Sequence, residues 1–208
     1  MQDFHAPRIH LSSLVAILLA LVGGAWVARA QSDIEAGARV ELRSVKFAQV
    51  RAASGGGTWT EGVVELGVIA SSEGGTYARW AGPVRVALQI AIRKRSGEFD
   101  FYRATAEAVA LEAGRASFRF YLPPEIARRE QLTSAEPHSW LVEITVAGQP
   151  QSAGPAHASP LLASPDALRS FKDRVARQAT LNDGVLVPQQ DSPFADAYAG
   201  ETPTFVHR

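Results

Sequence analysis

Cysteine is absent from the 208 residues of the sequence, and its absence excludes several kinds of chemistry. Without thiols the chain has no disulfide, no thiolate nucleophile and no cysteine ligand for a metal ion. A lipid-modified N-terminus is excluded as well, because that modification needs a cysteine at the cleavage point. We therefore expect the hydrophobic core alone to stabilise the folded domain.

An excess of charge of one sign is also missing. The chain has 21 Lys and Arg residues against 21 Asp and Glu residues, so its formal net charge is +0. Proteins that bind nucleic acid carry a basic surface that meets the phosphates, so charge gives no support for such a partner. The remaining composition, 46% hydrophobic and 20% charged, is that of a globular protein with a core of its own.

Motifs for catalysis and metal binding are absent too. His138, His157 and His207 are not spaced as metal ligands, and we expect each of them to be a solvated surface residue. There is no Gly-x-Ser-x-Gly elbow and no phosphate-binding glycine loop. Nothing in the sequence brings acidic residues such as Glu61 and Asp100 together, so we expect them to be solvated. The chain is therefore predicted to have no catalytic residue, no cofactor and no metal, and not to be an enzyme.

The N-terminus has the three parts of a secretory signal peptide. Arg8 and His10 give a weakly positive start, residues 11–27 are mostly apolar, and Ala28-Arg29-Ala30 places small residues where a signal peptidase reads them. We expect residues 1–30 to be this signal peptide, with cleavage before Gln31. The alternative is an uncleaved membrane anchor, because the apolar run is at the short limit of a membrane span. Either alternative predicts an exported protein.

Alternation of apolar and polar side chains dominates residues 38–147. The clearest run is 84–92, in which every second residue is a large aliphatic, and this period of two is typical of a strand. The same pattern recurs over residues 64–68, 118–122 and 140–146. Residues 39–50 change phase near Ser44, which predicts a β-bulge. For the alanine-rich residues 101–111 we favour a strand over a helix.

Glycine-rich turns separate these runs and complete the fold prediction. With a short piece at 76–80, the region contains about seven strands at the spacing of a small antiparallel β-sandwich of immunoglobulin type. An open barrel is the main competitor. Pro123-Pro124 and the residues that follow predict a short helical crossover before the last strand.

The C-terminal third is expected to be less regular. Residues 148–163 are rich in Pro, Gly, Ser and Ala and indicate a linker. A helix is predicted over 164–183, capped by Ser164, which packs on the domain or on a partner. Residues 184–208 are expected to form a mostly irregular tail. The β-sandwich, residues 38–147, is therefore expected to fold without residues 1–30 and 189–208.

Two groups of side chains are candidates for a contact surface. Tyr77 and Trp80 lie near a turn, where exposed rings stack on a sugar or pack against a protein. Trp59 and Trp140, by contrast, are expected to be core residues in line with their strands. The second group is the apolar stripe of the predicted C-terminal helix, which consists of Leu168, Phe171 and Val175.

Several segments of the chain resemble a family of exported verrucomicrobial proteins. One of these segments is the strand at 84–92. The others are Trp59-Thr-Glu-Gly-Val-Val-Glu-Leu, Arg119-Phe-Tyr-Leu-Pro-Pro-Glu-Ile-Ala-Arg-Arg, Trp140-Leu-Val-Glu-Ile-Thr-Val-Ala-Gly and Leu181-Asn-Asp-Gly-Val-Leu-Val-Pro-Gln. That family is encoded beside a type IV pilus-like gene cluster, best known from the genus Akkermansia. The resemblance covers residues 38–190 and brings no catalytic residue with it.

The resemblance implies an immunoglobulin-like β-sandwich and a periplasmic or envelope-associated accessory of the pilus-like system. The chain lacks the Gly-Phe-x-x-x-Glu start of a pilin, so it is similar to an accessory and not to the fibre subunit. We expect protein–protein contacts with other envelope or pilus-assembly proteins, no nucleic acid, and contact with the membrane only through an uncleaved N-terminal segment. The sequence also allows a homo-oligomer. The alternative function is an extracytoplasmic carbohydrate-binding module that uses exposed aromatic residues.

Overall fold

The structure, a computed structural model, describes residues 38–206 except positions 54, 73, 74, 153 and 199. Residues 1–30, for which we expect a signal peptide or an anchor, lie outside the described residues. Within the described part of the chain, no helix is long and apolar enough to cross a membrane.

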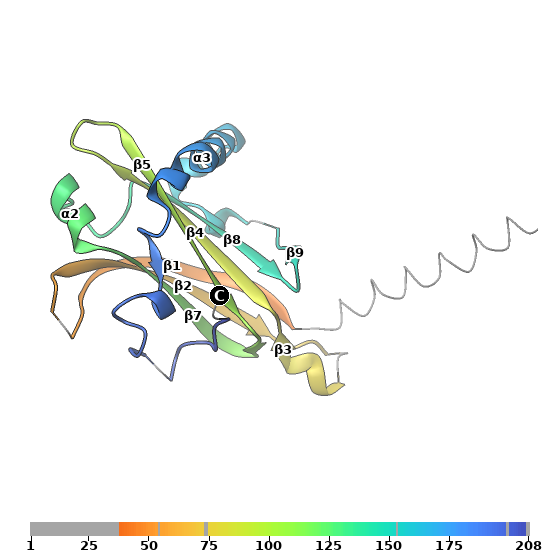
Figure 1. Cartoon of the computed structure of the whole chain (residues 1–208). Coiled ribbons are helices and arrows are strands. Elements are labelled where there is room, and N and C mark those ends of the chain that lie inside the picture. Colours follow the sequence, from red (N-terminus) through yellow and green to blue (C-terminus); the bar gives the residue numbers. More distant parts are fainter. Residues whose placement is uncertain (1–37, 54, 73–74, 153, 199, 207–208) are drawn as a thin grey trace, which may run out of the picture. The chain divides into compact units, whose positions relative to one another are not determined.

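Two antiparallel four-stranded sheets form a β-sandwich (Figure 1). The first sheet has the strand order β1 (Arg39–Arg51), β2 (Thr58–Ile69), β7 (Gly114–Leu122) and β10 (Val187–Pro188). The second has the order β5 (Phe99–Ala108), β4 (Val84–Arg93), β8 (Ser139–Val146) and β9 (Gln149–Pro150). The short strands β3 (Trp80–Ala81) and β6 (Leu111–Glu112) pair with each other. The predicted sandwich is therefore confirmed.

Side chains that alternate along the strands meet between the two sheets and form the main core. Val84, Val86 and Leu88 of β4 are fully buried, and they face Val64 and Leu66 across the sandwich in the same cluster. The small residues of β5, such as Ala106 and Ala108, are buried in this cluster as well. Alanine at these positions leaves room for large neighbours, which explains why a strand forms despite the modest strand preference of alanine.

Two local expectations have different outcomes. The pairing of β1 with β2 shifts its register between Leu42 and Ser44, which confirms the predicted bulge. The piece at 76–80, expected as a short strand, is instead the 3-10 helix η1 (Gly75–Arg79), and only Trp80 and Ala81 pair as β3. The glycines before Thr76 favour a turn at this position.

The α-helices begin at the prolines that the sequence indicated. Helix α2 (Pro124–Glu130) is the crossover between β7 and β8, with Pro124 in its first turn. Helix α3 (Pro165–Gln178) begins after Ser164, whose side chain accepts a hydrogen bond of 3.1 Å from the Ala167 amide. It continues into the 3-10 helix η4 (Ala179–Asn182).

Helix α3 covers the outer face of the second sheet (Figure 1). Phe171 and Val175 pack on Phe101 and Leu141, which point away from the main core. The segment expected as a linker, 148–163, contains β9 and the 3-10 helices η2 (Pro155–His157) and η3 (Pro160–Leu162). Leu162 is buried beneath α3. This segment therefore carries side chains that hold α3 on the sheet.

The C-terminal tail covers the outer face of the first sheet. After β10 the chain forms the 3-10 helix η5 (Gln189–Asp191), and Phe194 then packs on Tyr121 and Trp59. Phe205 returns to the main core, where its ring meets Phe118 at a centroid distance of 5.7 Å. The tail has few regular elements, as expected, but its apolar residues are parts of the packed domain.

Candidate functional site

A cavity of about 510 Å³ lies between the β4–β5 hairpin and the end of helix α3 with η4. The hairpin contributes charged residues and two phenylalanines, because alternate residues of a strand point to the two faces of the sheet. Helix α3 contributes Arg174 and Gln178, which lie one helical turn apart. The lining of this cavity is therefore mixed and contains both charged side chains and aromatic rings.

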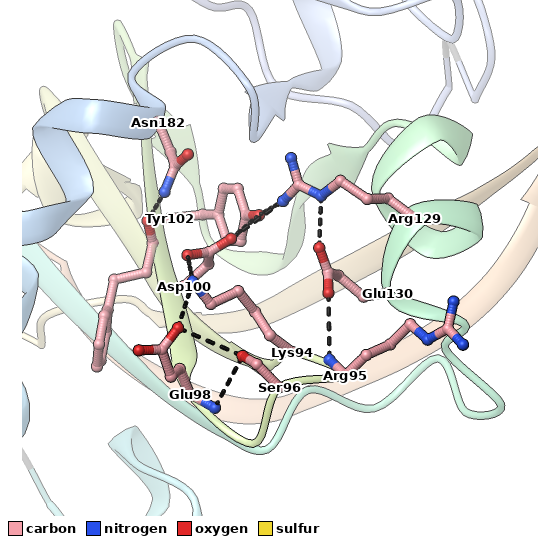
Figure 2. A network of polar contacts seen from close by, with 10 residues as sticks. Lys94, Arg95, Ser96, Glu98, Asp100, Tyr102, Arg129, Glu130 and Asn182 are labelled. Atoms are coloured by element: carbon pink, nitrogen blue, oxygen red, sulfur yellow. Dashed lines mark hydrogen bonds and ion pairs between the residues drawn. The ribbon is translucent and has the colours of Figure 1, made fainter.

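Figure 2 shows the network of charges beside this cavity. The Lys94 ammonium group lies 3.1 Å from the Glu98 carboxylate and 3.3 Å from Asp100. The Arg129 guanidinium, which comes from helix α2, lies 3.0 Å from the other oxygen of Asp100. The hydrogen bond with Lys94 lowers the pKa of the Glu98 carboxylate. Each of these carboxylates already has a cationic partner.

The same network joins helix α2 to the second sheet. Arg129 donates a hydrogen bond of 3.2 Å to the Tyr102 hydroxyl and also contacts Glu130. Burial raises the pKa of Tyr102 to about 12, so its hydroxyl stays protonated at neutral pH. Burial also raises the pKa of Glu130, but hydrogen bonds from Arg129 and the Arg95 amide outweigh it, and this pKa is lowered. Each charged side chain of this network therefore has a partner of opposite charge, and these pairs hold helix α2 against the second sheet.

A second cavity of about 230 Å³ adjoins the first and is mostly apolar. Phe99, Phe101 and Arg174 line both cavities, and the second also has Leu162 and Phe171 in its wall. Its remaining lining residues are Ala91, His138, Ser139, Ala167 and Ser170, so no carboxylate borders it. Taken together, the two cavities form one groove along α3, which we call the α3 groove.

A separate cluster of charges is buried beneath the C-terminal tail. Arg119 pairs with Glu61 at 3.2 Å, and their side chains are only 11% and 6% exposed. The Tyr121 hydroxyl donates a hydrogen bond of 2.8 Å to the same carboxylate. Burial raises the pKa of Tyr121 above its usual value. The expectation that Glu61 is solvated was wrong, because the tail covers this face of the sheet.

Residues of the tail complete this buried cluster. The Tyr198 ring lies 3.9 Å from the Arg119 guanidinium carbon, and Glu201 lies 3.0 Å from the same guanidinium. Gln189 is fully buried, and its amide donates hydrogen bonds to the carbonyls of Phe194 and Ala197. These contacts stabilise the tail on the sheet and give the cluster a structural role.

His157 is buried and is not the solvated surface residue that the sequence led us to expect. The side chain is only 9% exposed and its Nδ1 atom has no hydrogen-bond partner among the described residues. The 3-10 helix η2 places it against β8, where burial lowers its pKa and a hydrogen bond with the Val142 backbone opposes this effect. His157 is therefore buried in its neutral form at neutral pH.

We expect His157 to make the domain sensitive to mild acid. Its lowered pKa means that the unfolded chain binds a proton more readily than the folded one, so this contribution to stability is present above the ordinary pKa of 6.5 and is lost as the pH falls through the lowered value. Between about pH 7 and about pH 5, the wild type should therefore lose more stability than His157→Gln in urea unfolding. The same substitution at the exposed His138 is the matched control. Parallel pH curves for the wild type and His157→Gln would contradict the prediction.

The predicted contact residues have different locations. Trp80 is 47% exposed and is available to a partner. The Tyr77 side chain lies outside what the structure describes. Phe171 and Val175 are only 5% and 4% exposed, because their own sheet covers most of their surface, and of the two only Phe171 lines the smaller cavity. Leu168 is partly buried against the same cluster.

Sequence reasoning missed the α3 groove, although one signal was present. Ala91, Phe101 and Leu141 occupy positions where a solvent-facing strand residue is normally polar. Three such positions on neighbouring strands indicate that another element covers that face. The sequence does not show which end of the covering helix lies beside a groove. Nothing in it therefore distinguishes Arg174 from other exposed arginines.

Comparison with solved structures finds a likeness to the crystal structure of a protein from Akkermansia muciniphila. The TM-score is 0.61 at 13% sequence identity, and the alignment covers 82% of this chain and 94% of that one. At this identity the likeness shows the fold alone. No family model matches the chain. No curated protein matches it either.

Proposed function

We propose that this chain is a non-enzymatic accessory protein of the bacterial cell envelope, exported to the periplasm. It acts by protein–protein contacts and associates with a type IV pilus-like or secretion system. The pilus association rests on the sequence resemblance described above. The fold likeness to a protein from Akkermansia muciniphila supports this proposal, because the sequence resemblance predicts a shared fold.

The observation that carries the contact role is the free edge of β1. This strand pairs with β2 along one side, and among the described residues its other side makes no hydrogen bond through the backbone. An exposed strand edge presents N–H and C=O groups to which an extended segment of another protein adds as a further strand. At thirteen residues, β1 is long enough for such an addition.

The other sheet edges offer less to a partner. The edge strands β9 and β10 have two residues each. The end of β5 is occupied by the tail, where the Val109 amide bonds to the Thr204 carbonyl at 3.1 Å and Val206 bonds to Glu107. Short or covered edges are two ways in which proteins avoid unwanted pairing. Strand β1 has a bulge, but it is long, and among the described residues its outer side has no backbone hydrogen bond.

The polar clusters support a contact protein more than an enzyme. The carboxylates beside the larger cavity are held in ion pairs with Lys94 and Arg129, and Glu61 is held by Arg119. A general base or a nucleophile needs a group that is free to exchange a proton near neutral pH. Fixed pairs of this kind stabilise elements against one another and leave no such group in these clusters.

Site-specific cross-linking in cells tests the proposal. A photo-reactive amino acid at Ala48 or Gln49, both exposed on β1, should give cross-links to envelope proteins that include secretin or pilus-assembly components. The same amino acid at the exposed Ala176 of α3 is the control and should not give these products. If β1 yields no product and deletion of the gene leaves the pilus machinery intact, the proposal is wrong.

A carbohydrate-binding module is the second candidate, and the exposure of Trp80 favours it. A glycan array probed with the purified protein separates the two functions. If the chain acts by protein–protein contacts, we expect it to bind no glycan on the array. Sugar binding that disappears in Trp80→Ala would support the module instead.

A further inference from the structure

We propose that the α3 groove binds the C-terminal residues of a partner protein whose last residue is apolar or aromatic. This inference rests on the proposed function, because it names the chemistry of one contact of this envelope protein. It uses a different face of the molecule from the β1 edge.

The smaller cavity provides the apolar part of the site. Its wall contains Phe99, Phe101, Phe171 and Leu162, and at about 230 Å³ it holds the volume of several water molecules. An apolar side chain that replaces this water gains the free energy of burial. The cavity therefore favours a large apolar group over a polar one.

Arg174 provides the charge. It is exposed, it lines both cavities, and within the described residues it has neither an ion pair nor a hydrogen bond. Of the other cations of α3, Lys172 pairs with Glu143 at 2.7 Å and Arg169 with Asp166 at 3.5 Å, while Arg177 lines neither cavity. A guanidinium group binds a carboxylate through two parallel hydrogen bonds, so Arg174 suits a ligand with one carboxylate beside its apolar group.

The acids of the larger cavity have cationic partners other than Arg174. Lys94 lies 3.1 Å from Glu98 and 3.3 Å from Asp100, and Arg129 adds a second cation to Asp100 (Figure 2). Arg174 is therefore the cation of the groove that lacks a partner within the described part of the chain. At the smaller cavity, whose lining among the described residues includes Arg174 but no Asp or Glu, the groove is complementary to a single negative charge.

The shape of the groove favours a peptide over a small acid. A C-terminal residue has a side chain and a carboxylate on the same carbon, so one enters the apolar cavity while the other meets Arg174. The residues before it then extend into the larger cavity of about 510 Å³, past Gln178, Asn182 and Leu181. Leu181 is 85% exposed, and a peptide there would cover this leucine. A free fatty or aromatic acid leaves the larger cavity unused.

Binding to a peptide pool tests the inference. Hexapeptides randomised at the last two positions, with a free carboxylate, are passed over the immobilised full chain. We expect retained peptides to be enriched for aromatic and aliphatic last residues, and the same pool with C-terminal amides to show no enrichment. Arg174→Gln should weaken binding of a retained peptide at least about tenfold, because the lost hydrogen bonds are made to a charged group.

The controls use the same helix and a simpler ligand. Arg177→Gln changes an exposed arginine outside both cavities and should bind like the wild type. Unfolding midpoints of both variants should match the wild type, since both positions are exposed. Equal retention of amides, no enrichment, or unchanged binding by Arg174→Gln would overturn the inference. Binding of decanoate without binding of any peptide would overturn it in favour of a free acid. None of these results affects cross-linking at β1, so the two proposals fail separately.

Discussion

Replacement of Glu61 by glutamine is expected to lower the free energy of unfolding by about 3 kcal/mol. Glutamine keeps the size of the side chain and accepts the hydrogen bond from Tyr121, but it leaves the Arg119 guanidinium without its buried anion. Removal of one partner from a buried pair costs about 3–5 kcal/mol, because the other charge stays desolvated. We expect the lower end of this range, since Glu201 and the Tyr198 ring remain in contact with Arg119.

Urea unfolding at neutral pH measures this effect. Glu112→Gln is the matched control, because Glu112 pairs with Arg79 at 2.9 Å while both side chains are largely exposed. Such a surface pair contributes about 0–1 kcal/mol, so the control should be close to the wild type. The double variant Glu61→Gln with Arg119→Met should recover much of the loss, because the buried charge is gone. A loss below about 1 kcal/mol for Glu61→Gln alone would show that the pair is not desolvated.

Phe194→Ala is expected to destabilise the domain by about 3 kcal/mol or more. The Phe194 ring is stacked on Tyr121 at a centroid distance of 4.3 Å and an angle of 9°, and its edge meets Trp59 at 5.9 Å. It is only 6% exposed, so truncation leaves a cavity between the tail and the first sheet. Its loss also weakens the cover over the Glu61–Arg119 pair.

Thermal and urea unfolding of Phe194→Ala and of Leu161→Ala compare a buried with an exposed position. Leu161 is 58% exposed, and its truncation should cost little. These contacts also bear on the expectation that residues 38–147 fold without residues 1–30 and 189–208. Phe194 and Phe205 pack in hydrophobic clusters, so a chain that lacks residues 189–208 should be less stable than the full domain. Equal stability of Phe194→Ala and the wild type would show that the tail is not part of the packed domain.

The sandwich was predictable because its signal is local. In β4, valine at 84 and 86 and leucine at 88 alternate with smaller or polar residues, and a period of two is enough to assign a strand and its inner face. The bulge near Ser44 was visible for the same reason, since one extra residue reverses the alternation. Neither assignment requires knowledge of which strands are neighbours.

The covering of the two outer faces was not predictable in the same way. Glu61 and Arg119 are 58 residues apart in the sequence, and each looks like an ordinary solvent-facing strand residue. Only the tail, which returns over the first sheet, makes them a buried pair. His157 is buried by a similar long-range contact with β8. Contacts of this kind depend on tertiary packing. The alternation of apolar and polar residues along a single strand does not reveal them.

The candidate site illustrates the same limit. Phe171 and Val175 were correctly placed on the apolar face of a helix, but that face packs on its own sheet, and of the two only Phe171 borders the groove. Arg174, one residue before Val175, borders the groove because it lines both cavities together with Phe99 and Phe101 at the start of β5. The sequence contains the helix and its face, while the position of the helix over the sheet determines which of its residues can bind.

We propose that this protein works through contacts made at the edge of β1, whose outer side has no backbone hydrogen bond among the described residues. Cross-linking from Ala48 and Gln49 in living cells, followed by mass spectrometry of the products, tests it most directly. We predict products with envelope or pilus-assembly proteins from both positions and none of them from Ala176. The same products from Ala176, or none from β1 at normal protein levels, would contradict the claim.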